Sequence, residues 1–352
     1  MKQKKYIGLY ETMRDKILRG EYRPGERLPS KRVAADRYGC SLITAERAYM
    51  LLEDEGYIVA RERSGYFVCA APSLPPGSGE RPQKPPCRLP EPAAQPAEGF
   101  ESSVWVRTVR RVLAEHPECL SLRSPDRGCA VLRNAIADYL LRYRGMHADP
   151  RRIVIGSGAE QLYECVVKLL GRERIYGIED PSYDRIRIAY SGMGASVCPL
   201  RLGEDGIDSE ALRRGRFDVL HVTPFHSYPS GVTTSIAKRC EYLRWSACCG
   251  GYIVEDDYDS EFFLPGRPIE TLYSLGGGER IVYINTFSRS LSPAMRLGYM
   301  ILPEPLLEVY DRRLGGSPCS VPVPDQYILA AFIADGSFER HLNRMRRKMK
   351  RP

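Results

Sequence analysis

A run of prolines divides this chain into a short first part and a long second part. Between Ala71 and Glu98 the sequence holds nine prolines, together with Gly77 and Gly79. Because proline fixes its φ angle and has no N–H to donate, such a run excludes helix interiors and sheet ladders. We therefore predict a small domain at residues 1–70, a proline-rich linker at 71–98 and a large domain at 99–352.

The overall composition is typical of a folded, water-soluble protein. Hydrophobic residues make up 43% and charged residues 27% of the chain, which excludes a disordered or fibrous chain. No apolar run approaches the ~18 residues that a membrane helix needs, and charged residues interrupt the N-terminal stretch in which a signal peptide would lie. We therefore expect a cytoplasmic protein without a membrane partner.

The eleven cysteines and the basic C-terminal stretch indicate no site by themselves. No two cysteines have C-x-x-C spacing, so the pattern predicts neither a disulfide framework nor a metal site, and we interpret the cysteines as buried small hydrophobes. The net charge of +8 includes +6 from residues 343–352, which hold six Lys or Arg and no acid. A solvated helix face is the simplest explanation of that stretch.

The pattern of residues 1–70 predicts three helices and a short hairpin. The predicted helices lie at 6–19, 31–38 and 42–55, and the predicted strands at 57–60 and 66–68. Leu18 belongs to the apolar face expected for the first helix, and Ser30 and Ser41 are suited to cap the other two. Two helices around a glycine turn, followed by a two-stranded wing, describe a winged helix-turn-helix.

Several motifs of this small domain, taken in order, resemble the GntR-type DNA-binding domain. They are LPSKR at 28–32, AY at 48–49, LEDEGY at 52–57 and GYFV at 65–68. The resemblance implies that the third helix enters the major groove of double-stranded DNA, while the start of the second helix and the wing hold the backbone. The residues it implies for DNA binding are Ser30, Lys31, Arg32, Ser41, Thr44, Arg47, Arg61, Arg63 and Gly65.

The third helix departs from the pattern of many such domains, in which an arginine follows the capping serine. This chain has Leu42 and Ile43 there, and Glu46 further along. Apolar side chains suit thymine methyl groups and a carboxylate suits the cytosine amino group, but neither makes the usual arginine–guanine contact. The operator sequence of relatives is therefore not transferable to this chain.

The large domain alternates strand-like and helical segments, which predicts an α/β fold with a mostly parallel sheet. Each apolar strand ends in polar or aromatic residues, where open α/β sheets place their ligands. The strand at 153–155, for example, leads through Gly156 and Ser157 to a helix at 160–170. Free N–H groups at such a helix start suit a phosphate, although a plain tight turn explains the same residues.

This series of strand ends resembles the fold-type I aminotransferases, a three-layer α/β fold. Its motifs are SPDRG at 124–128 with LR at 132–133, SGA at 157–159, EDP at 179–181 with Tyr183, and EDDYDSEF at 255–262. With a winged helix in front, the chain resembles the MocR subgroup of GntR regulators over almost its whole length outside the linker.

The resemblance implies a pocket for pyridoxal 5′-phosphate. The residues it implies for the phosphate are Ser157, Gly158, Ala159, Glu160, Ser288, Ser290 and Arg296. Tyr183 would stack on the pyridine ring, Asp256 would pair with the ring nitrogen, and Tyr258 would lie near the ring hydroxyl. Arg185 is placed to receive the carboxylate of a ligand.

Two departures limit what the resemblance implies. The Schiff-base lysine of the family belongs between Ser288 and Ser290, where this chain has Arg289. Because arginine keeps its proton in proteins, it cannot act as that amine nucleophile, and we expect the cofactor to bind weakly and without a covalent link. Its charge near the phosphate residues would favour an anionic ligand. Second, the chain stops in the basic stretch where relatives begin a C-terminal small domain, so we expect that domain to be missing or truncated.

The sequence therefore favours a transcriptional regulator over an enzyme. We expect the winged helix to bind a DNA operator, and the aminotransferase-like domain to form a homodimer and sense an effector, with an amino acid or a vitamin B6-related compound as the candidates. Two alternatives stay open. One is an active pyridoxal phosphate-dependent aminotransferase with an appended DNA-binding domain, an alternative that Arg289 disfavours. The other is a decayed gene product.

Overall fold

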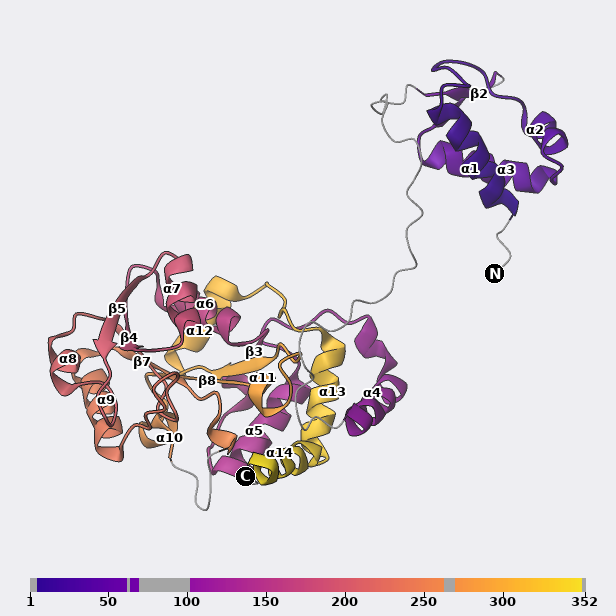
Figure 1. Cartoon of the computed structure of the whole chain (residues 1–352). Helices are drawn as coiled ribbons and strands as arrows, with labels where there is room; N and C mark the ends of the chain where they lie inside the picture. Colours follow the sequence, from indigo (N-terminus) through magenta and orange to yellow (C-terminus); the bar gives the residue numbers. More distant parts are fainter. Residues whose placement is uncertain (1–4, 62–63, 70–101, 263–269, 350–352) are drawn as a thin grey trace. The chain divides into compact units, whose positions relative to one another are not determined.

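The computed structural model describes residues 5–61, 64–69, 102–262 and 270–349. The chain divides into two compact units, Met1–Ala93 and Ala94–Pro352, which are drawn in Figure 1. The predicted linker at 71–98 lies outside the described residues, so its boundaries stay a prediction, and Arg63 of the predicted wing is not described either. None of the described helices is both long and apolar enough to span a membrane.

The first unit contains three helices and an antiparallel hairpin, as the sequence pattern predicts. These elements are α1 (Lys5–Leu18), α2 (Lys31–Arg37), α3 (Leu42–Asp54), β1 (Ile58–Arg61) and β2 (Gly65–Val68). Met13 of α1 and Tyr49 of α3 are fully buried in its core. Leu18 was expected on the buried face, but 43% of its surface is exposed because it is the last residue of α1.

The two predicted caps are present and set where the second and third helices begin. The hydroxyl of Ser30 accepts a hydrogen bond from the Val33 N–H at 3.3 Å, and that of Ser41 accepts from the Thr44 N–H at 3.2 Å. Each hydroxyl satisfies one of the N–H groups that a helix start leaves without a partner. The start of α3 is therefore fixed by local sequence.

A seven-stranded sheet forms the centre of the second unit, in the order β3-β9-β8-β7-β6-β4-β5. The strands are β3 (Ile153–Gly156), β4 (Ile175–Asp180), β5 (Ser196–Arg201), β6 (Val219–Val222), β7 (Tyr252–Asp256), β8 (Ile281–Thr286) and β9 (Gly298–Ile301). Only β9 among these described strands runs against its neighbours, with Tyr299 opposite Asn285 of β8. The predicted mostly parallel α/β sheet is confirmed.

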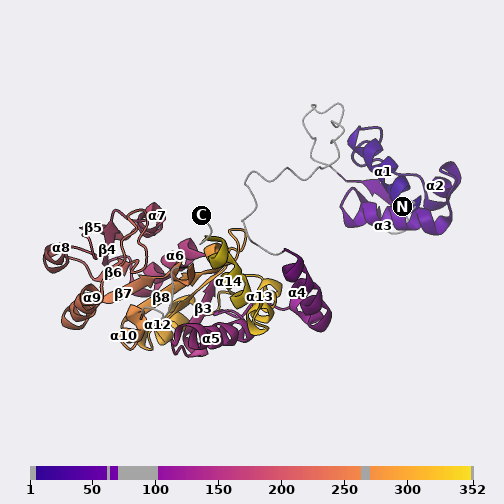
Figure 2. The same ribbon diagram turned by 60° about the horizontal axis from the view of Figure 1, so that its bottom comes forward.

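Helices cover both faces of this sheet, so the second unit has three layers (Figures 1 and 2). The helices are α4 (Ser102–Glu115), α5 (Ala130–Arg144), α6 (Ala159–Leu170), α7 (Asp184–Gly192), α8 (Ser209–Arg214), α9 (Ile236–Cys249), α10 (Leu272–Leu275), α11 (Phe287–Ser290), α12 (Pro305–Leu314), α13 (Val323–Ala334) and α14 (Ser337–Met349). Short 3-10 turns lie at Pro117–Leu120, Pro150–Arg152 and Ser260–Phe262. Apolar residues of α6, α7 and α12 form the core on one face, and those of α5, α13 and α14 contribute to the core on the other. Alternate residues of β7 and β8 enter the two cores, which explains why the strands are apolar throughout.

The cysteines do not all behave as expected from the sequence. Cys119, Cys129 and Cys165 are buried, but Cys240, Cys248 and Cys249 are exposed on α9. The interpretation of the cysteines as buried hydrophobes is therefore wrong for these three, because they lie on the solvent side of a helix that covers the sheet.

The acidic end of β7 is buried and depends on partners from other elements. Glu255 accepts hydrogen bonds from the N–H groups of Leu272 and Tyr273 at 2.7 and 2.8 Å. Asp257 has no exposed surface, and its Oδ2 lies 3.0 Å from Nη1 of Arg144, which is 2% exposed. A charge removed from water needs such a partner. The pair therefore joins α5 to the end of β7, where the candidate pocket lies.

Replacing Arg144 with Met should destabilise the second unit strongly, because Asp257 would stay buried without its cation. We expect the free energy of unfolding to fall by about 3–5 kcal/mol, measured by urea unfolding. The matched control is Arg142→Met on the same helix: its side chain is 52% exposed, it pairs with Glu339, and its loss should cost less than about 1 kcal/mol. Replacing Arg144 and Asp257 together with Met should restore part of the loss. Equal effects of the two single variants would contradict a dominant role for the buried pair.

Candidate ligand pocket and nucleic-acid interface

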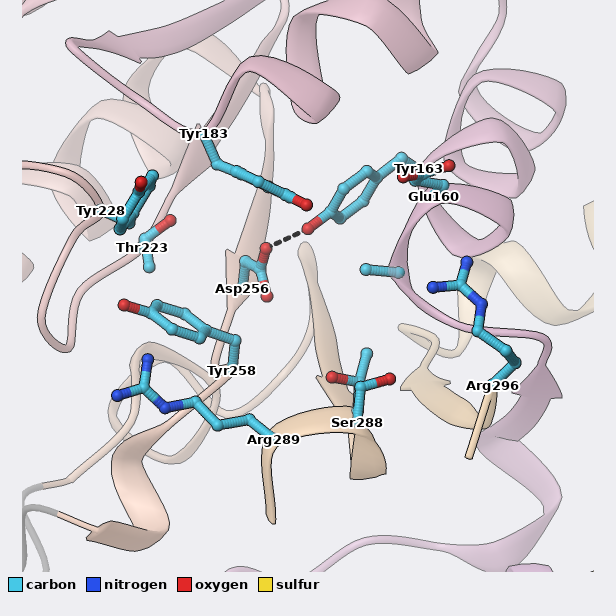
Figure 3. Close-up of a pocket in the computed structure, with 12 residues that line it drawn as sticks. Glu160, Tyr163, Tyr183, Thr223, Tyr228, Asp256, Tyr258, Ser288, Arg289 and Arg296 are labelled. Atoms are coloured by element: carbon cyan, nitrogen blue, oxygen red, sulfur yellow. Dashed lines mark hydrogen bonds between the residues drawn. The ribbon is translucent and has the colours of Figure 1, made fainter. Parts of the chain in front are cut away.

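A cavity of about 270 Å³ lies at the carboxyl ends of β6, β7 and β8. Figure 3 shows side chains from these strand ends and from α6 pointing into it. Its lining residues are Ala159, Glu160, Tyr163, Tyr183, Thr223, Tyr228, Asp256, Tyr258, Thr286, Ser288, Arg289 and Arg296. This is the place where open α/β sheets bind ligands.

The cavity brings together most of the residues that the sequence places in a cofactor pocket. Seven of them line it, namely Ala159, Glu160, Tyr183, Asp256, Tyr258, Ser288 and Arg296. Gly158 adjoins them: its φ is +96°, and a Cβ built on it would lie 3.2 Å from Nη2 of Arg296. A side chain at position 158 would therefore be strained and would crowd the arginine.

Ser157 and Ser290 do not line the cavity. The backbone N–H of Ser157 donates to the side-chain oxygen of Gln161 at 3.3 Å. Ser290 is buried, and its hydroxyl donates to the Thr286 carbonyl at 3.4 Å. Of the two serines that flank Arg289, only Ser288 reaches the cavity, because the short helix α11 turns Ser290 towards the interior.

Asp256, at the floor of the cavity, belongs to a buried chain of hydrogen bonds. It is 4% exposed, and Tyr163 of α6 donates its hydroxyl to Oδ2 of Asp256 (Figure 3). Nε2 of His221 lies 3.7 Å from the same oxygen, and Nδ1 of His221 is 2.6 Å from the Tyr190 hydroxyl. Burial, and then the neighbouring Asp256, raise the pKa of Tyr163 well above its usual value, which keeps its hydroxyl a donor. The other carboxylate oxygen, Oδ1, is buried without a hydrogen-bond partner among the described residues.

Tyr163 and His221 are missing from the residues that the sequence predicts for this pocket. Tyr163 lies four residues into α6, and its spacing there is that of an ordinary buried helix residue. His221 lies within the buried strand β6. The local sequence carries no signal for either contact, because their partner Asp256 follows much later in the chain.

Arg289 lies on the wall of the cavity, but its charge faces a buried carboxylate. Its Nη1 is 3.4 Å from Oδ2 of Asp259, which has no exposed surface, and its guanidinium lies 5.3 Å from the centre of the Tyr258 ring. Nδ1 of His226 is 3.0 Å from the same oxygen of Asp259. Figure 3 shows Arg289 and Arg296 on opposite sides of the cavity. This geometry therefore does not favour the expected contribution of Arg289 to a phosphate site next to Arg296.

Arg185 and Tyr183 lie at the rim of the cavity. The Arg185 side chain is 56% exposed, and its Nε is 3.6 Å from Oε1 of Glu160. Arg185 does not line the cavity itself. Tyr183 is 44% exposed, and its ring meets that of Tyr228 edge to face at 6.1 Å. Both Tyr183 and Arg185 stay candidates for contact with a ligand that enters from this side.

Glu179, at the end of β4, holds the loop that forms one wall of the cavity. It accepts a hydrogen bond from the Ser227 hydroxyl at 2.6 Å and one from the Thr223 N–H at 3.2 Å. Thr223 lines the cavity. Burial raises the pKa of Glu179 to about 7, although both hydrogen bonds oppose the shift.

A second cavity, an open groove of about 370 Å³, lies on the first unit. It is lined by Arg27, Leu28, Ser30, Lys31, Arg32, Leu42, Glu46, Gly65 and Tyr66. Four of the residues predicted to bind DNA are among them: Ser30, Lys31, Arg32 and Gly65. The start of α2, the start of α3 and the wing thus meet at one surface.

The remaining residues predicted to bind DNA lie outside the groove. Ser41 and Thr44 bond each other through their hydroxyls at 2.8 Å at the start of α3. Arg47 and Arg61 are exposed, and the guanidinium of Arg61 lies 4.6 Å from the centre of the Phe67 ring. Sequence reasoning missed Arg27: its Nε would be 3.1 Å from a Cβ on Gly65, whose φ is +102°, so only glycine fits beside it.

No group of three or more metal-ligating side chains occurs in the part of the chain that the structure describes. The two cavities differ in what they offer a ligand. The first offers a buried carboxylate, aromatic rings and two arginines, of which Arg289 faces Asp259, and the second offers exposed cations beside apolar side chains.

Comparison with known proteins shows the family of the chain. The model of "Bacterial regulatory proteins, gntR family" matches residues 5–68. The chain is 32% identical over 351 residues to the uncharacterized HTH-type transcriptional regulator YdeL of Bacillus subtilis, covering 97% of this chain and 76% of YdeL. It is 30% identical over 362 residues to the probable rhizopine catabolism regulatory protein MocR of Rhizobium meliloti, covering 96% and 73%. The chain belongs to the MocR-type GntR family of transcriptional regulators.

The second unit of this regulator has the aminotransferase fold. An archaeal alanine:glyoxylate aminotransferase matches it with a TM-score of 0.64 and 24% identity, over 70% of this chain and 63% of that chain. The α-aminoadipate aminotransferase LysN of Thermus thermophilus, solved with N-(5′-phosphopyridoxyl)-L-leucine, matches with a TM-score of 0.63 and 27% identity, over 72% and 65%. The chain thus spans less than two thirds of the length of these two enzymes. The predicted fold class is confirmed, and the chain is a DNA-binding transcriptional regulator with an aminotransferase-like unit.

The stability of the regulator should fall as the pH rises from about 4.5 to 7, in part because of Glu179. Its folded-state pKa of about 7 lies above the ordinary value of 4.5, so in this window the folded chain holds a proton that the unfolded chain releases. Glu179→Gln does not titrate and should flatten this fall: its one oxygen can still accept from the Thr223 N–H, and its amide N–H can donate to the Ser227 hydroxyl. The measurement is the urea midpoint at several pH values, with exposed Glu210→Gln on α8 as the control. An unchanged pH profile in Glu179→Gln would contradict the assignment.

Proposed function

We propose that the second unit binds a phosphorylated vitamin B6 compound without a covalent link and acts as the effector-sensing part of the regulator. The observation that carries the proposal is the buried Asp256, whose Oδ1 has no hydrogen-bond partner among the described residues. A protonated pyridine nitrogen is the kind of donor that such a carboxylate needs. The phosphopyridoxyl compound in LysN supports this ligand class.

The residues around the cavity fit such a ligand in two parts. The start of α6 at Gly158 and Ala159, together with Ser288 and Arg296, would hold the phosphate, because helix N–H groups and a guanidinium suit an anion. The amide of Glu160, which also lines the cavity, belongs to the same set, whereas Ser157 and Ser290, which do not line it, are left out.

The ring side of the pocket has three candidate contacts. Tyr183 would stack on the ring, Asp256 would accept from its nitrogen, and Tyr258 would lie near its hydroxyl. Arg185 at the rim stays a candidate for the carboxylate of an amino-acid effector. When bound, pyridoxal phosphate supplies an electron sink and a reactive aldehyde.

Arg289 separates this proposal from enzymatic activity. A guanidinium remains protonated, so it does not supply the amine that attaches the cofactor covalently. Its pairing with buried Asp259 holds it at the wall next to Tyr258. We therefore propose a binding protein, while the alternative of an active aminotransferase requires a lysine elsewhere in the cavity, and no lysine is among its lining residues.

Treatment with pyridoxal phosphate and borohydride should leave the cavity of the natural protein without a pyridoxyl label, because no amine lines it. Arg289→Lys should acquire one label per chain at position 289, since the rest of the pocket is kept. Peptide mapping by mass spectrometry locates the label. Arg289→Gln is the matched control and should stay unlabelled there. A stoichiometric label on a lysine in the cavity of the natural protein would overturn the proposal, and an unlabelled Arg289→Lys would show that the pocket does not hold this cofactor.

The proposal includes a homodimer bound to a double-stranded operator. Two winged helices reading a repeated half-site require two copies of the chain, and enzymes with this fold place their pockets at a dimer interface. A monodisperse monomer in light scattering, with or without DNA, would contradict it. Protection of a specific DNA site by the protein, upstream of its own or a neighbouring gene, would also separate a working regulator from a decayed gene product.

Binding to DNA should weaken steeply as salt is added, because cations that contact phosphates release counterions. Arg32→Ala, which removes a cation from the groove, should lower affinity for a specific site by about 1–3 kcal/mol if the side chain reads a base. Arg19→Ala, an exposed arginine just after α1, is the control and should have little effect. Gel shifts at several salt concentrations provide the measurement. Salt-independent binding, or equal effects of both variants, would count against the assigned surface.

A further inference from the structure

The exposed face of α3 is unusually apolar for a surface that meets DNA. Leu42 and Ile43 at its start are 45% and 66% exposed, and Met50 two turns later is 54% exposed. The opposite face, with Ala45, Ala48 and Tyr49, is fully buried. The apolar side chains are therefore not needed for the core, and in the free protein they are in contact with water.

The acid on this face, Glu46, is paired within the protein. Nζ of Lys31 at the start of α2 donates to Oε1 of Glu46 at 2.8 Å. The same ammonium lies 5.3 Å from the centre of the Tyr66 ring in the wing. The hydrogen bond to Glu46 raises the pKa of Lys31, so the ammonium stays charged. Three elements thus hold one carboxylate in place.

A carboxylate that approaches DNA meets the repulsion of the phosphates. The ammonium of Lys31 cancels the charge of Glu46 and leaves its second oxygen, Oε2, able to accept a further hydrogen bond. In the major groove, the base edge that suits a carboxylate is the amino group of cytosine, and the edge that suits an exposed aliphatic side chain is the methyl group of thymine.

We propose that this chain reads a pyrimidine-containing half-site: Leu42 and Ile43 contact thymine methyl groups, and Glu46 accepts a hydrogen bond from cytosine. Lys31 is then a positioning residue for Glu46 and not a phosphate contact. The inference rests on the proposed binding of DNA by this unit. It deepens that function by naming the bases and the residues that select them.

The first test uses the full chain and a double-stranded DNA pool with a randomised core. The sequences selected should share thymine and cytosine at fixed positions. Replacing each of those thymines by uracil removes one methyl group and should weaken binding by about fourfold for each methyl. The loss should disappear in the Leu42→Ala, Ile43→Ala double variant and persist in Leu18→Ala, whose leucine is equally exposed but lies at the end of α1.

The second test exchanges the hydrogen-bonding group. Glu46→Gln should change the preferred base from cytosine to adenine at one position, because a primary amide pairs with the adenine edge. Lys31→Ala should weaken the cytosine preference on the order of tenfold, while the dependence of log affinity on log salt keeps its slope. Arg47→Ala, an exposed cation one residue further along α3, should instead lower that slope by about 0.9 if it contacts a phosphate.

The outcomes separate this inference from the function on which it rests. Selected sites in which uracil replaces thymine without loss, or an unchanged base preference in Glu46→Gln, would overturn the readout but leave DNA binding intact. A lower salt slope in Lys31→Ala would show that Lys31 contacts phosphate, which overturns its positioning role. Failure of the pool to yield any enriched sequence, with no salt-dependent binding, would overturn the DNA-binding function itself.

Discussion

The burial of acidic side chains in the last residues of β7 and just after them determines much of the second unit. Within seven residues the chain buries five acids, namely Glu255, Asp256, Asp257, Asp259 and Glu261. Removing so many carboxylates from water is costly, so each requires partners in the protein. Backbone N–H groups of α10 serve Glu255, Arg144 of α5 serves Asp257, and Asn285 of β8 donates to Glu261 at 3.0 Å. These partners come from elements far apart in the sequence, and they meet at the acidic residues because each buried carboxylate needs a hydrogen-bond donor or a cation.

The same constraint explains how an arginine fits at position 289. Asp259 is fully buried, and the cationic or titratable groups next to it include Arg289 and His226. Burial raises the pKa of Asp259, while these two neighbours lower it. The guanidinium therefore stabilises the ionised form of Asp259, and its length lets it lie over the Tyr258 ring at the cavity wall. Arg289, which cannot attach the cofactor covalently, is thus held in place by the acidic segment that follows β7.

The sequence predicts the elements well because caps, glycines and apolar periodicity act locally. Ser30 and Ser41 cap the helices for which they were expected, and the residues that follow β6, β7 and β8 do meet in one cavity. Two kinds of information were missing. Order along the chain does not tell which way a side chain turns in a short helix, so Ser288 and Ser290 looked equivalent. It also does not pair Tyr163 with Asp256, since nothing near either residue specifies the other.

Positive charge is a poor guide to ligand sites in this chain, although its net charge is +8. Both cavities contain a cation whose charge is directed to a carboxylate of the protein: Lys31 to Glu46 in one, and Arg289 to Asp259 in the other. Each cation looked like a ligand contact in the sequence, because its type and position suit an anion. In the structure each of these cations instead pairs with an acidic side chain of the protein. What distinguishes the two sites is exposure: Glu46 is half exposed and in the proposed readout meets a base, whereas Asp259 is fully buried and faces Arg289 and His226.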